Sequence, residues 1–361
     1  MNFNSFFLKS FRVLLLPFAL VYGLIVIIRN YLYDKKIIKS AEFNIPIICV
    51  GNLAVGGTGK SPMVEYLLDL LHKQFKTATL SRGYRRKTKG YVLANENTTA
   101  LDIGDEPMQF YLKYPDVKIA VGEERIVAIP QLLYDHYDIQ TIILDDAFQH
   151  REIKAGFNII LTQFGDLYSH DFFLPAGDLR DEWRSAKRAQ IIVVTKCPPD
   201  LSETQKQKVL KSLRPLPTQQ VFFTTIEYGT PYHILNRADE WVLTPSVEVL
   251  LVCGIANPKP LKDYLHQHTY TYYQKTFNDH HIFSIDDLNE IDDMFHDISA
   301  RNKVILTTEK DAVRLVKFNE ELKNIPFYVL PIKSKFLFNE EEKFNNAVIS
   351  FIKNFTAPPV N

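Results

Sequence analysis

The stretch Pro46-Ile-Ile-Cys-Val-Gly-Asn-Leu-Ala-Val-Gly-Gly-Thr-Gly-Lys-Ser-Pro62 decides the fold of this chain. Its first residues, Ile47 to Val50, form the apolar run of a buried β-strand, which ends at Gly51. A glycine-rich loop follows, and the residues after Pro62 have an apolar pattern typical of a helix. Strand, glycine-rich loop, Lys-Ser and helix, in this order, predict a phosphate-binding P-loop.

The P-loop interpretation gives each residue type a role. Glycines allow backbone N–H groups to point at phosphate oxygens, and the N-terminus of the helix adds partial positive charge. Lys60 would reach the β- and γ-phosphates, and the Ser61 hydroxyl would bind Mg²⁺. The first glycine of the motif G-x-x-x-x-G-K-[ST] is replaced by Ala54, and a simple glycine-rich turn is the alternative. The predicted nucleotide-binding residues are Ala54, Val55, Gly56, Gly57, Thr58, Gly59, Lys60 and Ser61.

Composition limits the class of protein. A chain of 361 residues with 46% hydrophobic residues is long enough for two domains with buried cores. The net charge of +0 gives no global electrostatic support for binding nucleic acid. Cys49, Cys197 and Cys253 have neither a CxxC nor a metal-binding spacing, which fits a reducing cytoplasm. No feature of the sequence indicates a protein partner.

The N-terminal segment is unusually apolar. Val13 to Ile28 carries no charge and lies between basic residues, which are Lys9, Arg12, Arg29, Lys35 and Lys36. A spanning helix needs about 20 apolar residues. A helix lying in the membrane surface is therefore favoured over a true span, and a buried core helix is the third possibility. No small-residue cleavage site follows, so a cleaved signal peptide is not expected.

Two pairs of acidic residues stand at ends of predicted elements. Gln140 to Asp146 is an apolar strand that ends in Asp145 and Asp146, the Walker B form, in which an acid lies close to the P-loop metal. Asp105 and Glu106 open a helix just before Pro107, which suits a first helical turn. N-capping alone would explain one of this second pair. The functional interpretation makes Asp105 a catalytic base and Glu106 a metal ligand beside Ser61, Asp145 and Asp146.

Other polar clusters also follow predicted strands. Arg82-Gly-Tyr-Arg-Arg-Lys87 is either an anion-binding loop or a solvated basic turn. His150 is as compatible with a structural hydrogen bond as with a substrate contact. Thr195-Lys-Cys-Pro198 weakly resembles the guanine-reading N-K-x-D of GTPases, but Pro198 replaces the aspartate, so selective use of GTP is not supported.

A proline-rich break, Arg214 to Pro217, predicts a domain boundary near residue 215. We expect an N-terminal helix over residues 1–36, a doubly wound P-loop domain over 37–215 and a smaller α/β domain over 216–361. In the last of these, the Asp279-His280 pair follows a strand, and this pair and Asp105 are the candidates for a base near an acceptor hydroxyl. A metal site at His280 and His281 is the rival interpretation. Ligands of α/β sheets bind at the carboxyl ends of strands, where all these motifs lie.

Seven motifs together resemble the tetraacyldisaccharide 4′-kinase family, the lipid A kinases. The similarity covers nearly the whole chain, in the order of the family, with Ser61 where Thr is frequent and Ala147 where Gly is usual. The motifs are Gly51-Asn-Leu-Ala-Val-Gly-Gly-Thr-Gly-Lys-Ser-Pro62, Ser81-Arg-Gly-Tyr84, Gly104-Asp-Glu-Pro107, Leu144-Asp-Asp-Ala-Phe-Gln-His150, Pro175-Ala-Gly-Asp-Leu-Arg180, Asn278-Asp-His-His281 and Thr308-Glu-Lys-Asp311.

The resemblance implies a kinase at the cytoplasmic face of the bacterial inner membrane, with ATP and Mg²⁺ as cofactors. It would transfer the γ-phosphate to the 4′-hydroxyl of a tetraacylated glucosamine disaccharide 1-phosphate, forming lipid IVA. It also implies that Asp105 is the general base, that His280 assists it, and that Asp279 and Lys60 belong to the catalytic set. Contacts to the lipid or to phosphate would come from Arg82, Tyr84, Arg125, His150 and Arg180.

Two other functions stay open from the residues alone. A P-loop GTPase or ATPase switch would act through protein partners and would need no base at an acceptor site. A membrane anchor with a vestigial P-loop would bind no nucleotide. Turnover of ATP with and without a lipid acceptor separates the three.

Overall fold

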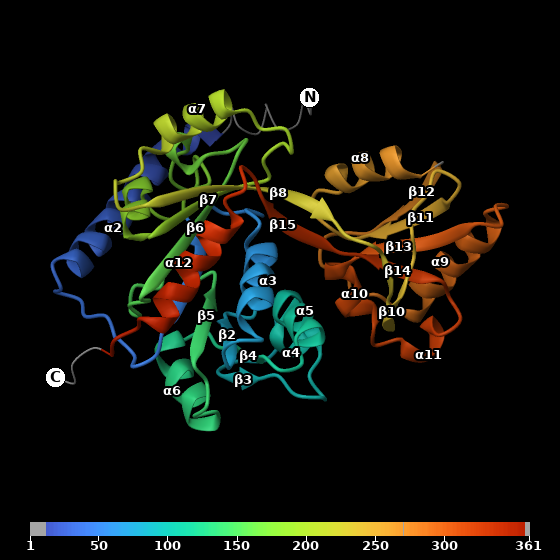
Figure 1. The fold of residues 1–361 in the computed structure, drawn as a ribbon, viewed down its shortest axis with the longest axis horizontal. Coiled ribbons are helices and arrows are strands. Elements are labelled where there is room, and N and C mark those ends of the chain that lie inside the picture. Colours follow the sequence, from blue (N-terminus) through green and yellow to red (C-terminus); the bar gives the residue numbers. More distant parts are fainter. Residues whose placement is uncertain (1–11, 270, 358–361) are drawn as a thin grey trace.

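The computed structural model describes residues 12–269 and 271–357, which form two α/β lobes connected by the long strands β8 and β15 (Figure 1). The α/β class and the P-loop type of topology predicted from the sequence are confirmed. The larger lobe contains the chain as far as β8 together with β15 and the helix that follows β15, and the smaller lobe contains the residues between β8 and β15.

The larger lobe is built on a nine-stranded sheet in the order β15-β8-β7-β6-β1-β5-β2-β4-β3. Its inner strands are parallel, whereas β3 and β15 pair antiparallel at the two edges. The strands are β1 (Ile47–Asn52), β2 (Thr77–Ser81), β3 (Val92–Leu93), β4 (Lys118–Val121), β5 (Thr141–Asp145), β6 (Phe157–Gln163), β7 (Ile191–Thr195), β8 (Gln220–Tyr228) and β15 (Ile332–Phe336).

Helices cover both faces of this sheet, because parallel strands bury both of their sides. Along β1, Ile47 and Cys49 point into one core, and Ile48 and Val50 point into the other. The first core is covered by α6 (Arg125–Asp135) and α7 (Glu203–Leu213). The second is covered by α3 (Lys60–Leu71), α5 (Asp105–Lys113) and α12 (Glu341–Lys353), with the short α4 (Ala100–Ile103) before α5.

The smaller lobe has a six-stranded sheet in the order β10-β9-β14-β13-β11-β12. Its strands are β9 (Tyr232–His233), β10 (Asn236–Glu240), β11 (Glu248–Cys253), β12 (Thr271–Thr276), β13 (Lys303–Thr308) and β14 (Phe327–Leu330). One face packs on α8 (Lys259–His268). The other packs on α9 (Ile285–Asp297), α10 (Glu309–Leu315) and α11 (Asn319–Leu322).

The domain boundary predicted near residue 215 differs from the structure. The proline-rich break lies between α7 and β8, and β8 is still part of the nine-stranded sheet. The chain then returns through β15, which pairs with β8 from Ile332↔Tyr228 to Phe336↔Thr224, and α12 packs on the larger lobe. The pairing of β8 with β15 is a long-range contact, so no local signal in the sequence reveals it.

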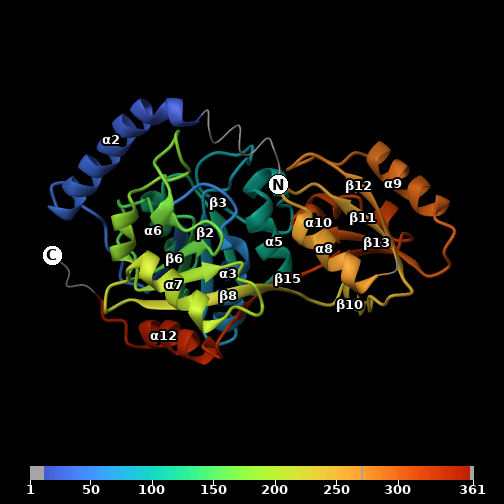
Figure 2. The ribbon, with the colours of Figure 1, turned by 90° about the horizontal axis from the view of Figure 1, so that it is seen from above.

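Helix α2 (Leu16–Asp34) lies along the outside of the larger lobe, on the side opposite α12 (Figure 2). Its length and apolar composition from Val13 to Asp34 are sufficient to cross a membrane, and only 17% of its most apolar window is buried. A core helix would bury most of its side chains, so the third possibility for this segment is wrong. Most of the apolar side chains face outward, and Leu20 is 71% exposed.

Polar contacts fix the inner side of α2 to the larger lobe. The buried Asn30 donates through Nδ2 to Asp181 Oδ1 at 2.7 Å, and its carbonyl accepts from Arg151 Nη1 at 3.0 Å. Tyr22 donates its hydroxyl to the carbonyl of Arg180 at 2.9 Å. A buried polar network of this kind specifies one seating of the helix, because each group would otherwise lose its hydrogen bonds.

A buried ionic bridge joins the two lobes. Lys113, at the end of α5, donates to Glu65 Oε2 on α3 at 2.7 Å and to Glu309 Oε1 on α10 at 2.9 Å. Glu309 Oε2 also accepts from the backbone N–H of Ile332 at 3.2 Å. Burial, and then the nearby charge of Glu309, raise the pKa of Glu65 to about 7.

The raised pKa predicts a pH-dependent stability. A carboxyl that titrates near pH 7 when folded and near 4.5 when unfolded binds its proton more tightly in the folded state. Its contribution to stability is therefore present below pH 4.5 and is lost as the pH rises through 7. We expect Glu65→Gln to gain stability relative to the unmodified chain between pH 5 and pH 8. Urea unfolding midpoints of both proteins at the two pH values measure this, and a constant difference would contradict it.

Candidate active site

The P-loop joins β1 to α3, as predicted. Gly59 caps the N-terminus of α3 at φ 84°, and Gly56 has φ 107°, a region of backbone space that favours glycine. At Gly51 a Cβ would lie 2.6 Å from Cβ of Phe148, so only glycine lets the end of β1 approach the loop after β5. Lys60 is the first residue of α3, where free backbone N–H groups and the helix dipole favour an anion.

Asp146 joins the P-loop to the loop that carries Arg180. Arg180 contacts both carboxylate oxygens of Asp146, at 3.1 Å and 2.7 Å. Lys60 Nζ lies 3.7 Å from Asp146 Oδ1 and donates to Asn52 Oδ1 at 3.3 Å. Burial alone would raise the pKa of Asp146, but the hydrogen bonds of Arg180 and the charge of Lys60 hold it below its usual value. The acid is ionised and faces Lys60.

Asp145 lies deeper than Asp146. Burial, together with the charge of Asp146, raises the pKa of Asp145 to about 7, and Glu106 acts in the same direction. Its Oδ1 is buried and has no hydrogen-bond partner among the described residues. A buried carboxylate oxygen without a partner requires a cation or a donor to offset its desolvation. Asp146 and Glu106 are both near enough for their charges to raise the pKa of Asp145.

The hydroxyl of Ser61 and the carboxylate oxygen of Asp145 that has no partner among the described residues fit Mg²⁺. Magnesium is usually bound by one or two carboxylates together with substrate phosphates and water, rather than by a cage of protein ligands. In residues 12–269 and 271–357, no group of three or more His, Cys, Asp or Glu side chains has the geometry of such a cage. Ser61 and the orphaned oxygen of Asp145 are the groups that would bind the ion, and its charge would stabilise negative charge on the phosphates.

Arg125 is a fully buried cation at the start of α6. Its Nη1 donates to the carbonyl of Glu123 at 3.1 Å, whereas its Nε and Nη2 have no partner within the described part of the chain. Burial lowers the pKa of Arg125. The negative charge of Asp146 raises this pKa, and the positive charge of Arg82 lowers it. A guanidinium with two unpartnered nitrogens, which together carry three N–H donors, is suited in such a place to a phosphate.

Asp105 and His280 meet across the boundary between the lobes. His280 Nδ1 lies 2.7 Å from Asp105 Oδ2, although the two residues are 175 positions apart in the chain. On the other side of the ring, Lys310 Nζ lies 3.2 Å from His280 Nε2 and 3.1 Å from Asp279 Oδ1. The structure therefore brings together Asp105 and His280, as the resemblance implies, and Asp279 contacts both Lys310 and, through Oδ2 at 3.5 Å, His280 Nε2.

The sequence analysis missed Arg314, on α10. Arg314 Nε donates to Asp105 Oδ1 at 2.9 Å, and Nη2 contacts Asp105 Oδ2. Burial would raise the pKa of Asp105, but the hydrogen bonds and charge of Arg314, followed by those of His280, hold it below its usual value. The motif Thr308 to Asp311 opens α10, and Arg314 lies three residues after Asp311, on the same side of this helix. This spacing is the sequence signal that could have linked Arg314 to the motif.

The remaining predicted residues lie around this centre with different partners. Tyr84 is exposed and its ring stands edge-on to His280, with centroids 5.9 Å apart. Arg82, also exposed, follows β2 and lies close enough to Arg125 to lower its pKa. His150 Nδ1 lies 2.9 Å from Glu152 Oε1, so it makes the structural hydrogen bond that its sequence allowed. His281 contacts Asp287 at 3.0 Å rather than joining His280, which is against a shared metal site.

Two further residues support the P-loop and were also missed. Asn52 donates to the carbonyl of Ala54 at 2.6 Å and accepts from Lys60. Gln149 donates to the carbonyl of Asn52 at 2.6 Å. Both lie inside motifs quoted from the sequence, and the contact of Gln149 forms only when β1 and β5 are side by side.

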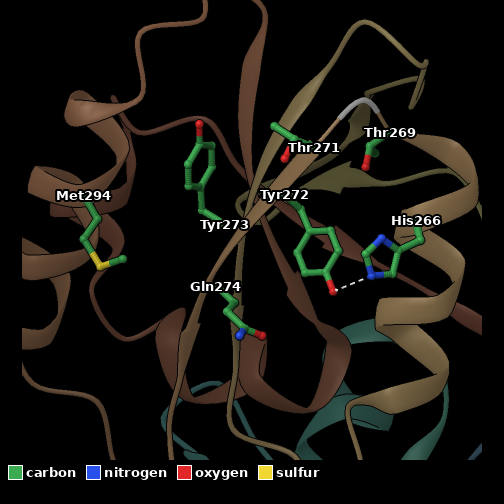
Figure 3. Close-up of a pocket in the computed structure, with 7 residues that line it drawn as sticks. All are labelled: His266, Thr269, Thr271, Tyr272, Tyr273, Gln274 and Met294. Carbon is green, nitrogen blue, oxygen red and sulfur yellow. Dashed lines mark hydrogen bonds between the residues drawn. The ribbon is translucent and has the colours of Figure 1, made fainter.

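A separate hollow of about 430 Å³ lies beside the edge strand β12 of the smaller lobe (Figure 3). Tyr272 and His266 approach each other on one side of the strand, with the hydroxyl 3.2 Å from Nε2, while Tyr273 and Met294 lie on the other. None of the P-loop or acid residues described above lines it. The hollow is therefore not the phosphate site.

A P-loop on a doubly wound sheet, two acids at the end of the neighbouring strand and a carboxylate–histidine pair define a nucleotide-dependent phosphotransferase. The family described as tetraacyldisaccharide-1-P 4′-kinase, LpxK, matches residues 11–353. The chain belongs to this family.

Named relatives agree with this assignment. A tetraacyldisaccharide 4′-kinase of Flavobacterium johnsoniae is 47% identical over 347 residues, covering 96% of this chain and 99% of the relative. One of Bacteroides thetaiotaomicron is 41% identical over 357 residues, covering 95% and 93%. A crystal structure described as apo-form LpxK from Aquifex aeolicus in complex with ATP superposes with a TM-score of 0.73 at 27% identity, covering 95% of this chain and 99% of that one.

Proposed function

We propose that this chain is a tetraacyldisaccharide 4′-kinase in which the two lobes share one active site. The larger lobe binds ATP at the P-loop, and the acceptor is the tetraacylated glucosamine disaccharide 1-phosphate, a lipid A precursor. The main support for a site shared by the two lobes is the contact of Asp105, on the larger lobe, with His280, on the smaller lobe, at 2.7 Å. A nucleotide switch needs no such pair.

In this proposal the larger lobe positions the phosphates. Backbone N–H groups of the P-loop and the first turn of α3 hold the β- and γ-phosphates, and Lys60 neutralises their charge. Arg180 and Arg125 supply further N–H groups, and those on Nε and Nη2 of Arg125 have no partner among the described residues. Phosphoryl transfer depends mainly on positioning and electrostatic stabilisation, so these contacts are expected to supply most of the catalysis.

Asp105 aligns the acceptor. The 4′-hydroxyl donates its hydrogen bond to the carboxylate and attacks the γ-phosphorus, and the bond from that phosphorus to the bridging oxygen of ADP breaks. The hydroxyl proton passes to Asp105, and His280 stabilises the carboxyl group through Nδ1. The pKa of Asp105 is lowered, so its carboxylate is a weak base. A weak base is sufficient here, because in a loose transition state the hydroxyl loses its proton only late in the transfer.

The helix α2 is proposed to dock the enzyme on the cytoplasmic face of the inner membrane, where its lipid acceptor lies. Its outward side carries apolar side chains, including Phe18, Leu20, Leu24 and Ile25, that are more than half exposed. Burying each would contribute roughly 1.5–3 kcal/mol. Basic flanking residues add about 1 kcal/mol each when close to anionic lipid.

The transfer itself is tested with ATP labelled in the γ-phosphate. We expect the label to appear on the disaccharide and to require both ATP and the acceptor. A nucleotide switch would instead release the label as inorganic phosphate at the same rate with and without acceptor, and that result would overturn the proposal.

The double variant Leu20→Asp, Leu24→Asp tests membrane docking. Two charges on the outward side of α2 should lower the fraction bound to phosphatidylethanolamine–phosphatidylglycerol vesicles by at least about tenfold. ATP binding should not change, because neither side chain contacts the larger lobe's nucleotide site. Val242→Asp, at a residue 71% exposed in the smaller lobe, is the matched control. Equal vesicle binding by both variants would refute the docking role. Substitution is preferable to deletion, which would remove the buried Asn30.

A further inference from the structure

Arg314 makes the most extensive polar contacts with the proposed base. Its Nε donates to Asp105 Oδ1 at 2.9 Å, its Nη2 contacts Asp105 Oδ2, and the same Nη2 lies 3.1 Å from His280 Nδ1. The Arg314 side chain is only 7% exposed and that of Asp105 12%. A planar guanidinium that contacts both oxygens of a carboxylate fixes the plane of the carboxylate as well as its charge.

Two groups approach His280 Nε2, and Lys310 Nζ at 3.2 Å is nearer than Asp279 Oδ2 at 3.5 Å. Lys310 has only donors, so His280 Nε2 accepts from its ammonium group at 3.2 Å. The proton of a neutral ring then lies on Nδ1, which donates to Asp105 Oδ2 at 2.7 Å. Asp279 contacts Lys310 at 3.1 Å and balances its charge. Both groups that approach Oδ2 are therefore donors.

These contacts use most of the acceptor capacity of Asp105. Two carboxylate oxygens offer about four acceptor positions. Arg314 and His280 occupy both positions of Oδ2, and Arg314 Nε occupies one position of Oδ1. A single position, on Oδ1, remains for another donor.

Arg314 is itself fixed within the smaller lobe. Its Nη1 lies 3.5 Å from Asp311 Oδ1, and the buried Asp311 accepts from the backbone N–H of Gly254 at 3.0 Å and from the hydroxyl of Thr308 at 2.8 Å. This chain of contacts runs from the ends of β11 and β13 to Arg314. The orientation of Asp105, on the larger lobe, is thus set by the rigid sheet of the smaller lobe.

We propose that Arg314 is a positioning residue, which orients Asp105 so that one acceptor position of Oδ1 receives the hydroxyl of the lipid acceptor. The inference rests on the proposed role of Asp105. It explains why an ion pair is placed on a catalytic carboxylate at all: in phosphoryl transfer the alignment of the attacking oxygen matters more than the strength of the base. It also makes a correctly docked smaller lobe a condition for the transfer step.

The test compares Arg314→Met with Lys113→Met. Both side chains bridge α5 and α10, but only Arg314 contacts Asp105, so Lys113 controls for loss of contact between the lobes. We expect Arg314→Met to lower kcat by about 10²-fold, the typical cost of misplacing a reacting group, with little change in KM for ATP. Lys113→Met should lower kcat much less. Arg314→Lys keeps the charge but loses the planar fork, and should recover part of the kcat.

A double variant decides whether Arg314 acts through Asp105. If it does, Asp105→Asn, Arg314→Met will be about as active as Asp105→Asn alone. Multiplicative losses, a kcat of Arg314→Met equal to that of Lys113→Met, or a raised KM for ATP at unchanged kcat would each overturn the inference. Full activity of Asp105→Asn would instead refute the base assignment of the proposed function. Thermal unfolding of every variant identifies any that fails to fold, and Arg314→Lys then replaces Arg314→Met in the cycle.

Discussion

We expect Lys60→Ala to lower the rate of ATP-dependent turnover by about 10²- to 10³-fold, the largest effect predicted for the nucleotide site. Lys60 is the first residue of α3, its side chain is only 18% exposed, and Nζ lies between Asn52 and Asp146. Removing a charge-assisted contact to the transferring phosphate costs on the order of 2–4 kcal/mol of transition-state stabilisation.

The measurement is label transfer to the lipid at saturating substrates, with unfolding curves to confirm that the variant is folded. Lys73→Ala, an exposed lysine just beyond the other end of α3, serves as the control and should remain near the activity of the unmodified chain. A folded Lys60→Ala protein with most of its turnover would show that this loop does not hold the transferred phosphate.

Asp105→Asn is expected to lower kcat by about three decades while ATP binding stays near normal. The amide cannot accept the hydroxyl proton, and it cannot accept from Arg314 on both of its terminal atoms. His280→Ala should act in the same direction. Because the two side chains form one unit, the double variant should be clearly less impaired than the product of the single losses.

Asp102→Asn is the matched control for this prediction. It makes the same change three residues earlier, where Asp102 caps the short helix α4 through Thr99. Steady-state kinetics and ATP binding of the three variants are compared. Weakened binding of ATP by Asp105→Asn would mark the residue as a ligand of the nucleotide or the metal rather than as the base.

Local sequence patterns predicted the parts of the site that local structure builds. The P-loop and the Asp145–Asp146 pair each lie at the end of a strand of the same sheet. An apolar run and the glycine or acidic residues that end it are therefore enough to predict their positions. The parallel order of β2, β5 and β1 then brings their carboxyl ends to one edge.

Other features depend on contacts between distant segments. Arg314 meets Asp105 across 209 positions of sequence, and nothing in the pattern around Arg314 indicates which acid it will contact. The same holds for Asn30, a polar residue in an apolar helix, whose partners Asp181 and Ser185 come from a loop far along the chain. These contacts arise from tertiary packing, so the local sequence does not indicate which residues will meet.

The return of the chain through β15 bears on the order in which the enzyme is synthesised and matures. A ribosome synthesises α2 long before α12, yet α12 supplies Phe344, Val348 and Ile352 to the core beneath α3. The nucleotide-binding lobe therefore cannot complete its core until α12 has been synthesised, whereas the smaller lobe can fold earlier as an insert whose two ends lie together, with Gly229 N donating to Pro331 O at 2.9 Å. A nascent chain stalled before residue 341 would already display its apolar N-terminal helix but would lack a finished catalytic core. Kinase activity can therefore appear only after α12 has been made, whereas the helix proposed to dock on lipid is made long before the catalytic core is complete.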